Sequence, residues 1–284
     1  MNRCRWAAIA LLTVACTAAL ALVLPLSAAE VAAPPAEAKP AGAASTGPKA
    51  ADNPLPEIAA DPTAWKSLLA GPDLAGWKKP TGDWQIVGEA AKDPANEKAI
   101  AVKPGTGVIY NGPKGRTGNL FTEAEFGDIA AHIEFMVPKG SNSGVYFMGR
   151  YEIQVYDSYG VEKDKYPGIE CGGIYERWDP ARGKGQEGFE GHSPRVNASR
   201  PPGEWQTFDV IFRAPRLDSA GKKTANARFV KVLHNGQVIH ENVELTGPTR
   251  AAASGDEKPT GPLMFQGDHG PVAYRNLRVL PLEK

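Results

Sequence analysis

Short runs that alternate apolar and polar residues constrain the fold of this chain more than any other feature. The clearest is residues 227–245, "ARFVKVLHNGQVIHENVEL", where two alternating runs flank Asn235-Gly236. A period of two puts successive side chains on opposite faces of a strand, and Asn-Gly favours the type I′ turn of a hairpin. Similar runs occupy residues 83–90, 129–138, 206–215 and 262–282. The pattern predicts an all-β domain built as a two-sheet antiparallel sandwich, with one short helix over residues 62–71.

The N-terminus has a different character. Arg3 and Arg5 precede a long apolar run, and Ser27 and Ala29 supply the small residues of a cleavage site. This predicts a signal peptide over residues 1–29, cleavage after Ala29, and a periplasmic or secreted protein. Two alternatives stay open, an uncleaved membrane anchor and lipidation at Cys16, because the run is near the length that spans a bilayer. Apart from that anchor no membrane partner is predicted, and a formal net charge of +0 argues against a nucleic-acid partner.

Residues 30–56 are rich in Ala and Pro and lack aromatic residues, so we expect a disordered tether between the signal peptide and a folded domain over residues 57–284. After cleavage the chain keeps one cysteine, Cys171, which excludes an internal disulfide. We expect a buried structural thiol there. A nucleophile is the alternative, but no histidine partner is visible in the sequence near it.

One hairpin, residues 141–160, "SNSGVYFMGRYEIQVYDSYG", carries polar residues where a site could form. Ile153 and Val155 should face the core, which leaves Glu152, Gln154 and Tyr156 on the opposite face. An amide and a carboxylate bind sugar hydroxyls, and an aromatic ring stacks on a pyranose. The alternative is an ordinary solvent-facing side of an antiparallel sheet.

Other candidates surround this row. Asp157 has core-side parity, so it should lie at the strand end, at a bulge, or bonded to backbone. A glycosidase with two carboxylates would need a partner for Glu152, and Glu134 and Glu176 are candidates. His269 lies in a Gly-flanked turn, where it either reaches a ligand or is simply solvated. No metal-binding motif is present and no cofactor is predicted, although loop oxygens could hold Ca²⁺ without leaving a motif.

Several segments resemble the 3-keto-disaccharide hydrolase domain family over roughly residues 65–282. They are "GVIYNG", "SNSGVYFMGRYEIQVYDS", "GGIYE", "GEWQTFDVIFRAPR", "HNGQVIHENVEL" and "GPLMFQGDHGPVAYRNLRVLPL". The resemblance implies a concanavalin-A-like β-sandwich of the jelly-roll type, export, and hydrolysis of glycosides whose C3 hydroxyl has been oxidised to a ketone. The substrate would then be an oligosaccharide or another glycoside. Arg275 and Asn276 also match the family pattern, and we expect them to be structural.

The chemistry of such a substrate suggests roles. A C3 ketone acidifies the C2 proton, so a base can form an enolate that expels the C1 substituent before water adds back. We assign Glu152, Arg150 and His269 as catalytic. The predicted substrate-binding residues are Asn142, Ser143, Gln154, Tyr156, Asp157, Tyr175 and Glu134. Two other functions stay open: a non-catalytic carbohydrate-binding module and an ordinary endoglucanase of the same shape.

Overall fold

The computed structural model describes residues 62–162 and 169–282, and their regular structure is almost entirely β. The predicted signal peptide (1–29) and tether (30–56) lie outside the described residues. In the described part of the chain the helices are two short 3₁₀ turns, η2 (Pro62–Ala64) and η4 (Pro180–Arg182). None of the helices in these ranges is long and apolar enough to span a membrane.

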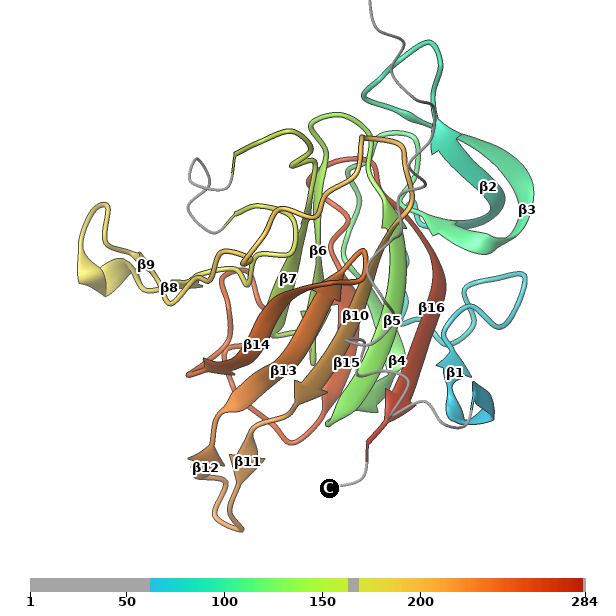
Figure 1. Ribbon diagram of the computed structural model, residues 1–284. Coiled ribbons are helices and arrows are strands. Elements are labelled where there is room, and N and C mark those ends of the chain that lie inside the picture. The colour runs from blue at the N-terminus through green and yellow to red at the C-terminus, as the bar shows by residue number, and fades with distance from the viewer. Residues whose placement is uncertain (1–61, 163–168, 283–284) are drawn as a thin grey trace, which may run out of the picture. The chain divides into compact units, whose positions relative to one another are not determined.

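The larger sheet is antiparallel and contributes one layer of a sandwich (Figure 1). Its strand order is β14-β13-β10-β5-β16-β3-β2, and β1 also pairs with β16. In that order the strands are β14 (Gln237–Leu245), β13 (Ala227–His234), β10 (Gln206–Arg213), β5 (Ile129–Met136), β16 (Ala273–Pro281), β3 (Ile100–Tyr110) and β2 (Gln85–Lys92), with β1 (Lys66–Ser67) beside β16.

The smaller sheet lies behind the larger one and has the order β4-β15-β6-β7 (Figure 1). Its strands are β4 (Leu120–Phe126), β15 (Gly261–Phe265), β6 (Asn142–Phe147) and β7 (Tyr151–Tyr156). Aromatic rings join the layers: Phe147 lies 5.3 Å from both Phe212 and Phe229, measured between ring centroids. These rings are fully buried, and each such side chain contributes about 1.5–3 kcal/mol through burial. The predicted all-β two-sheet sandwich is therefore confirmed.

Local predictions mostly agree with these strands. Asn235 and Gly236 have φ of 51° and 78° in a two-residue hairpin between β13 and β14, as the Asn-Gly signal predicted. The predicted helix over 62–71 is wrong. Lys66 and Ser67 pair with the second half of β16, which does not pair with β3. The Leu68 amide also donates to the Leu277 carbonyl of β16. Pairing with an available strand edge thus overrides helical periodicity.

Two small ribbons extend from the sandwich (Figure 1). One pairs β11 (Arg216–Leu217) with β12 (Lys223–Ala225). The other, which we call the β8–β9 arm (residues 177–189), pairs β8 (Arg177–Trp178) with β9 (Gly188–Phe189) and projects beyond β7 on one side. The arm belongs to the long irregular stretch between β7 and β10.

Candidate active site

The β6–β7 hairpin forms the floor of the candidate site. Its register pairs Tyr146 with Glu152 and Gly144 with Gln154, so these four residues share one face of the smaller sheet. On the opposite face Ile153 and Val155 are fully buried in the core, as the alternation predicted. The missing side chain at Gly144 is required, because a Cβ at that position would overlap the Glu152 carboxylate.

Glu152 is a buried acid with an incomplete set of partners. Its side chain is only 2% exposed. With the amide nitrogen of Gln154 facing the two oxygens, that nitrogen donates to Glu152 Oε1 at 2.9 Å and to the Ser143 carbonyl at 3.1 Å. Glu152 Oε2 has no hydrogen-bond partner among the described residues. An orphaned oxygen of this kind is expensive unless a ligand or a proton satisfies it.

The electrostatics keep this carboxyl protonated near neutral pH. Burial raises the pKa of Glu152 from 4.5 to about 8, the Tyr146 hydroxyl acts in the opposite direction, and the charge of Asp268 raises it further. Since Oε1 already accepts from Gln154, the proton belongs on Oε2. A group with this pKa can accept and return a proton near neutral pH.

The carboxyl opens into a hollow of about 160 Å³. Loops from distant parts of the chain complete it, and its lining consists of Asn142, Tyr146, Glu152, Gln154, Tyr175, Arg250, Ala251, Gln266 and His269. Residues 172–175 are held there by backbone pairing with β7. The Gly172 amide donates to the Gln154 carbonyl, and the Gln154 amide donates to the Gly173 carbonyl, both at 2.8 Å. The Gln266 amide donates to the Gly144 carbonyl at 2.9 Å, which places the loop after β15 over the same floor.

Arg250 is the cation of the hollow. Its backbone amide donates to the Glu176 carbonyl at 2.7 Å, and its Nη1 lies 3.5 Å from Glu176 Oε1. Burial raises the pKa of Tyr175, and the adjacent Arg250 opposes that shift. Ala251 follows with φ of 63°, a left-handed conformation that a non-glycine residue adopts at a cost.

His269 stands at the solvent-facing rim. Its ring is half exposed, and Nδ1 lies 2.6 Å from Asp268 Oδ1. This contact favours a proton on Nδ1 and orients the ring. Asn142, at the start of β6, also lines the hollow, and its Oδ1 is buried without a partner in the described part of the chain.

Arg150 is placed elsewhere. It ends the three-residue turn between β6 and β7, in which Met148 and Gly149 have φ of 56° and 65°. Its buried guanidinium donates to the Met148 carbonyl at 2.7 Å and to the Asp256 carbonyl at 2.5 Å. It therefore clamps the turn to the loop before β15. Arg150 does not line the hollow, because it lies in the turn, and the strand whose alternation would direct its side chain there begins only at Tyr151.

Three predicted binding residues also lie outside the lining. Ser143 is fully buried beneath the floor, where its hydroxyl donates to the Gln266 carbonyl at 2.7 Å. Tyr156 packs against the main core cluster. Asp157 follows the end of β7, one of the places its parity allowed, and accepts from the Gly140 amide at 2.9 Å.

Glu134 lies on the larger sheet, on the face turned away from the core. Its carboxylate accepts from Arg275 Nε at 2.6 Å and from Asn276 Nδ2 at 2.8 Å. Burial raises its pKa, but these two partners outweigh that and lower it. Arg275 and Asn276 thus have the structural role expected for them. Glu134 is not brought to the hollow, because strand parity says nothing about which sheet a residue joins.

Glu152 is consequently the one carboxylate among the described side chains of the lining, since Glu176 is engaged with Arg250 outside it. Within the described ranges no cluster of His, Cys, Asp or Glu has the composition of a metal site. Cys171 is buried as predicted, and burial raises the pKa of its thiol to about 12.

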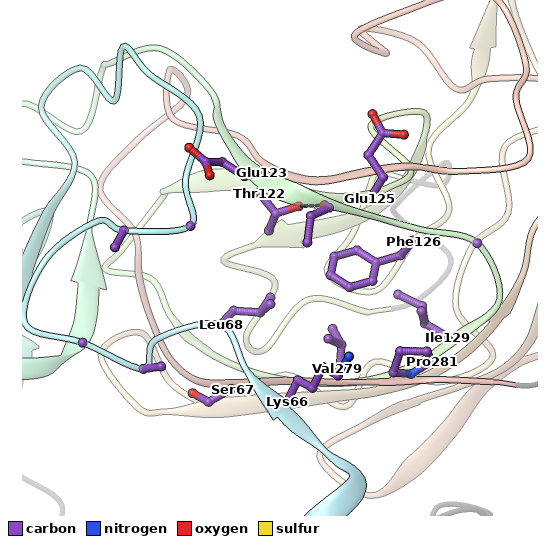
Figure 2. Close-up of a pocket in the computed structure, with 16 residues that line it drawn as sticks. Lys66, Ser67, Leu68, Thr122, Glu123, Glu125, Phe126, Ile129, Val279 and Pro281 are labelled. Carbon is purple, nitrogen blue, oxygen red and sulfur yellow. Dashed lines mark hydrogen bonds between the residues drawn. The ribbon is translucent and has the colours of Figure 1, made fainter.

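A larger hollow of about 790 Å³ lies elsewhere, between β1, β4 and the end of β16. Figure 2 shows Leu68, Phe126 and Ile129 on its inner surface, whereas the carboxylates of Glu123 and Glu125 point away from it. An apolar surface without a buried acid or base offers no group for glycoside chemistry. The smaller hollow is therefore the candidate active site.

Sequence reasoning missed four of the lining residues. Tyr146 could have been predicted, because counting back through the three-residue turn pairs it with Glu152. Arg250 and Ala251 had no local signal, since their loop meets β6 and β7 only after the strands assemble. Gln266 had one, because it stands three residues before His269 in a segment that carries the family resemblance.

The comparisons with known proteins bear on the family and the fold of the chain. A family model described as the 3-keto-alpha-glucoside-1,2-lyase-like domain matches residues 64–280. Among solved structures, a candidate glycosyl hydrolase from Parabacteroides distasonis is 27% identical with a TM-score of 0.55, covering 78% of this chain and 84% of that one. Another from the same organism is 17% identical with a TM-score of 0.49, covering 77% and 99%. No curated protein matches the chain. The first of these structures supports the predicted concanavalin-A-like sandwich.

Proposed function

The chain belongs to the 3-keto-alpha-glucoside-1,2-lyase-like domain family, and from that premise we propose that it is a carbohydrate-active enzyme that cleaves the glycosidic bond of 3-keto-glycosides, including 3-keto-disaccharides. The observation that carries the proposal is the single buried acid of the hollow, Glu152, with a pKa of about 8. Ordinary glycosidases need two carboxylates on either side of the scissile bond. One acid tuned near neutrality suits proton abstraction beside a ketone.

The reaction proceeds by elimination and then hydration. Ionised Glu152 takes the proton from C2, and the electron pair is delocalised onto the C3 oxygen as an enolate. The enolate collapses to a C1–C2 double bond while the C1–oxygen bond breaks and the leaving oxygen takes up a proton. Once the leaving group has departed, the proton on Glu152 exchanges with solvent. Water then adds its hydroxyl to C1 and passes its remaining proton to the group that protonated the leaving oxygen, while Glu152 delivers the exchanged proton to C2.

Two neighbours support these steps. Arg250 supplies the positive charge that an enolate oxygen requires, in the place that the sequence assigned to Arg150. His269, oriented by Asp268, supplies the proton for the leaving oxygen. Asn142 and Gln154 remain to bind sugar hydroxyls from the floor of the hollow.

The test is turnover of a 3-keto-glucoside in heavy water, followed by NMR, with an enzyme-free control for spontaneous exchange. Elimination and hydration would place deuterium at C2 of the product. Glu152→Gln should lower kcat by about 100-fold or more. Glu134→Gln, which changes a carboxylate outside the hollow, should leave turnover in place.

Three outcomes would contradict the proposal in different ways. Product without deuterium at C2 would exclude elimination. Release of reducing ends from an unoxidised glucan would identify an endoglucanase. Retention on a sugar column without turnover of any 3-keto-glycoside would favour a binding module.

We also propose that the protein is exported, on the strength of the basic, apolar and small-residue pattern of residues 1–29. N-terminal sequencing of the protein isolated from its native host should begin at Glu30. A chain that begins at Met1 and fractionates with membranes would instead indicate an anchor.

A further inference from the structure

The hollow is too small for a disaccharide. Its volume of about 160 Å³ falls below the range of roughly 300–1,000 Å³ that is typical of small-molecule sites. This volume holds one sugar ring, which is the ring that carries the ketone. The leaving sugar of a disaccharide must therefore lie against the surface next to the hollow.

Two aromatic side chains of the described residues are strongly exposed, Tyr159 at 53% and Trp178 at 42%. Exposed aromatic rings are natural platforms for the apolar face of a sugar. Tyr159 lines a separate hollow with Lys139 and Asp157. Trp178, in contrast, touches a wall of the candidate active site, because the Arg250 guanidinium lies 3.8 Å from its ring centroid.

The arm that carries Trp178 is built to hold it in place. Gly188, opposite Trp178 in the ribbon, leaves the space that the Glu176 carboxylate fills, and a Cβ there would overlap it. Glu176 in turn holds Arg250 against the indole ring. At the base of the arm, Arg177 Nη1 donates to Thr246 Oγ1 at 2.5 Å. A ring fixed in this way loses little freedom when a ligand stacks on it.

We propose that the β8–β9 arm forms the leaving-group subsite, with Trp178 as its aromatic platform and Arg250 as the residue shared with the hollow. This rests on the proposed function. The subsite takes a second pyranose or an aromatic aglycone, and it makes the protein selective for substrates with a large leaving group. Trp178 is a specificity-determining residue and has no part in the proton transfers.

The experiment compares kcat/KM for a 3-keto-disaccharide with kcat/KM for the methyl 3-keto-glucoside, whose leaving group is too small to reach the arm. The readout is the ratio of the two values. Trp178→Ala should lower this ratio about tenfold, mainly through KM, and Trp178→Phe should restore most of it. Tyr159→Ala, the matched control on the other exposed aromatic residue, should leave the ratio unchanged.

An unchanged ratio in Trp178→Ala, or a lowered ratio in Tyr159→Ala alone, would overturn the subsite. If the wild-type protein turned over neither substrate, the proposed function would fail separately. The subsite would then be tested by calorimetric titration with the unoxidised disaccharide. Weaker binding to Trp178→Ala than to wild type would support it, and equal binding would overturn it.

Discussion

Replacing Glu152 with glutamine should stabilise the fold at high pH, because the folded protein resists ionisation of this carboxyl, although the same change lowers turnover. Burial raises its pKa from 4.5 to about 8. Between these values the unfolded chain loses the proton and the folded chain keeps it. The folded state therefore binds more protons, and the wild-type free energy of unfolding falls as pH rises. The difference of 3.5 pH units (8 − 4.5) corresponds to about 5 kcal/mol once the pH exceeds 8.

Glutamine suits this test because it copies the shape of the protonated acid. Its oxygen can accept from Gln154 as Oε1 does, and its nitrogen replaces the protonated Oε2. Urea denaturation of wild type and Glu152→Gln from about pH 4.5 to about pH 9 gives the difference in free energy of unfolding. It should be near zero at the acid end and grow by about 1.4 kcal/mol per pH unit up to pH 8.

Glu123→Gln, which makes the same chemical change at an exposed carboxylate, provides the control for the substitution itself. A flat difference between wild type and Glu152→Gln across the whole range would refute the reasoning. It would mean that Glu152 ionises in the folded protein as readily as in water, and the proton-transfer role would lose its physical basis.

Gly144→Ala should lower kcat/KM about 100-fold, with an unchanged circular dichroism spectrum, because the added methyl displaces the Glu152 carboxylate; near-normal kinetics would contradict the crowding. Arg250→Ala should lower kcat about 100-fold with little change in unfolding free energy. Arg150→Ala should instead lower that free energy by about 3 kcal/mol, because it removes a buried guanidinium that donates to the buried Met148 carbonyl and to the part-buried Asp256 carbonyl. Steady-state kinetics and urea denaturation separate the two, and the reverse pattern would restore Arg150 to the site. Asp128, just before β5, is buried and forms ion pairs with Arg213 at 2.8 Å and Arg216 at 2.6 Å. Burial raises the pKa of Asp128, but the two arginines outweigh it and hold the pKa at about 2, so Asp128→Asn should cost about 2 kcal/mol above pH 4 and progressively less towards pH 2. Denaturation curves with the same loss at every pH would exclude this ion pairing.

The sequence was sufficient for what depends on one hairpin. Alternation placed Ile153 and Val155 in the core and Glu152 and Gln154 on the opposite face, and the structure has them there. Parity is a property of a single strand, so nothing distant can alter it. Parity gave Asp157 the core side and left three placements open for a charged residue there; in the structure it follows the end of β7 and accepts from the Gly140 amide.

What depended on assembly could not be predicted. Arg250 joins the lining of the hollow only through a loop that is ordered by contacts with residues 149, 150 and 176. Arg150 and Glu134 have suitable side chains but lie away from the hollow. Arg150 lies in the turn between β6 and β7, and Glu134 lies on the larger sheet. The chemical type of a side chain therefore selected candidates from the sequence. The long-range order of the strands and loops then decided which candidates lie together in the hollow.

The three-residue turn between β6 and β7 has a consequence for how this protein can change in length. Phe147 and Tyr151 are the last pair before the turn, and every pair beyond them follows in strict alternation up to Asn142 and Tyr156. Deleting one residue at the start of β7 would shift the register by one and turn Glu152 towards the core, with Ile153 taking its place in the hollow. Insertions and deletions in this hairpin would therefore remove the acid without replacing any residue of the site. The spacing from Gly144 to Glu152 should stay constant in every protein that keeps this chemistry.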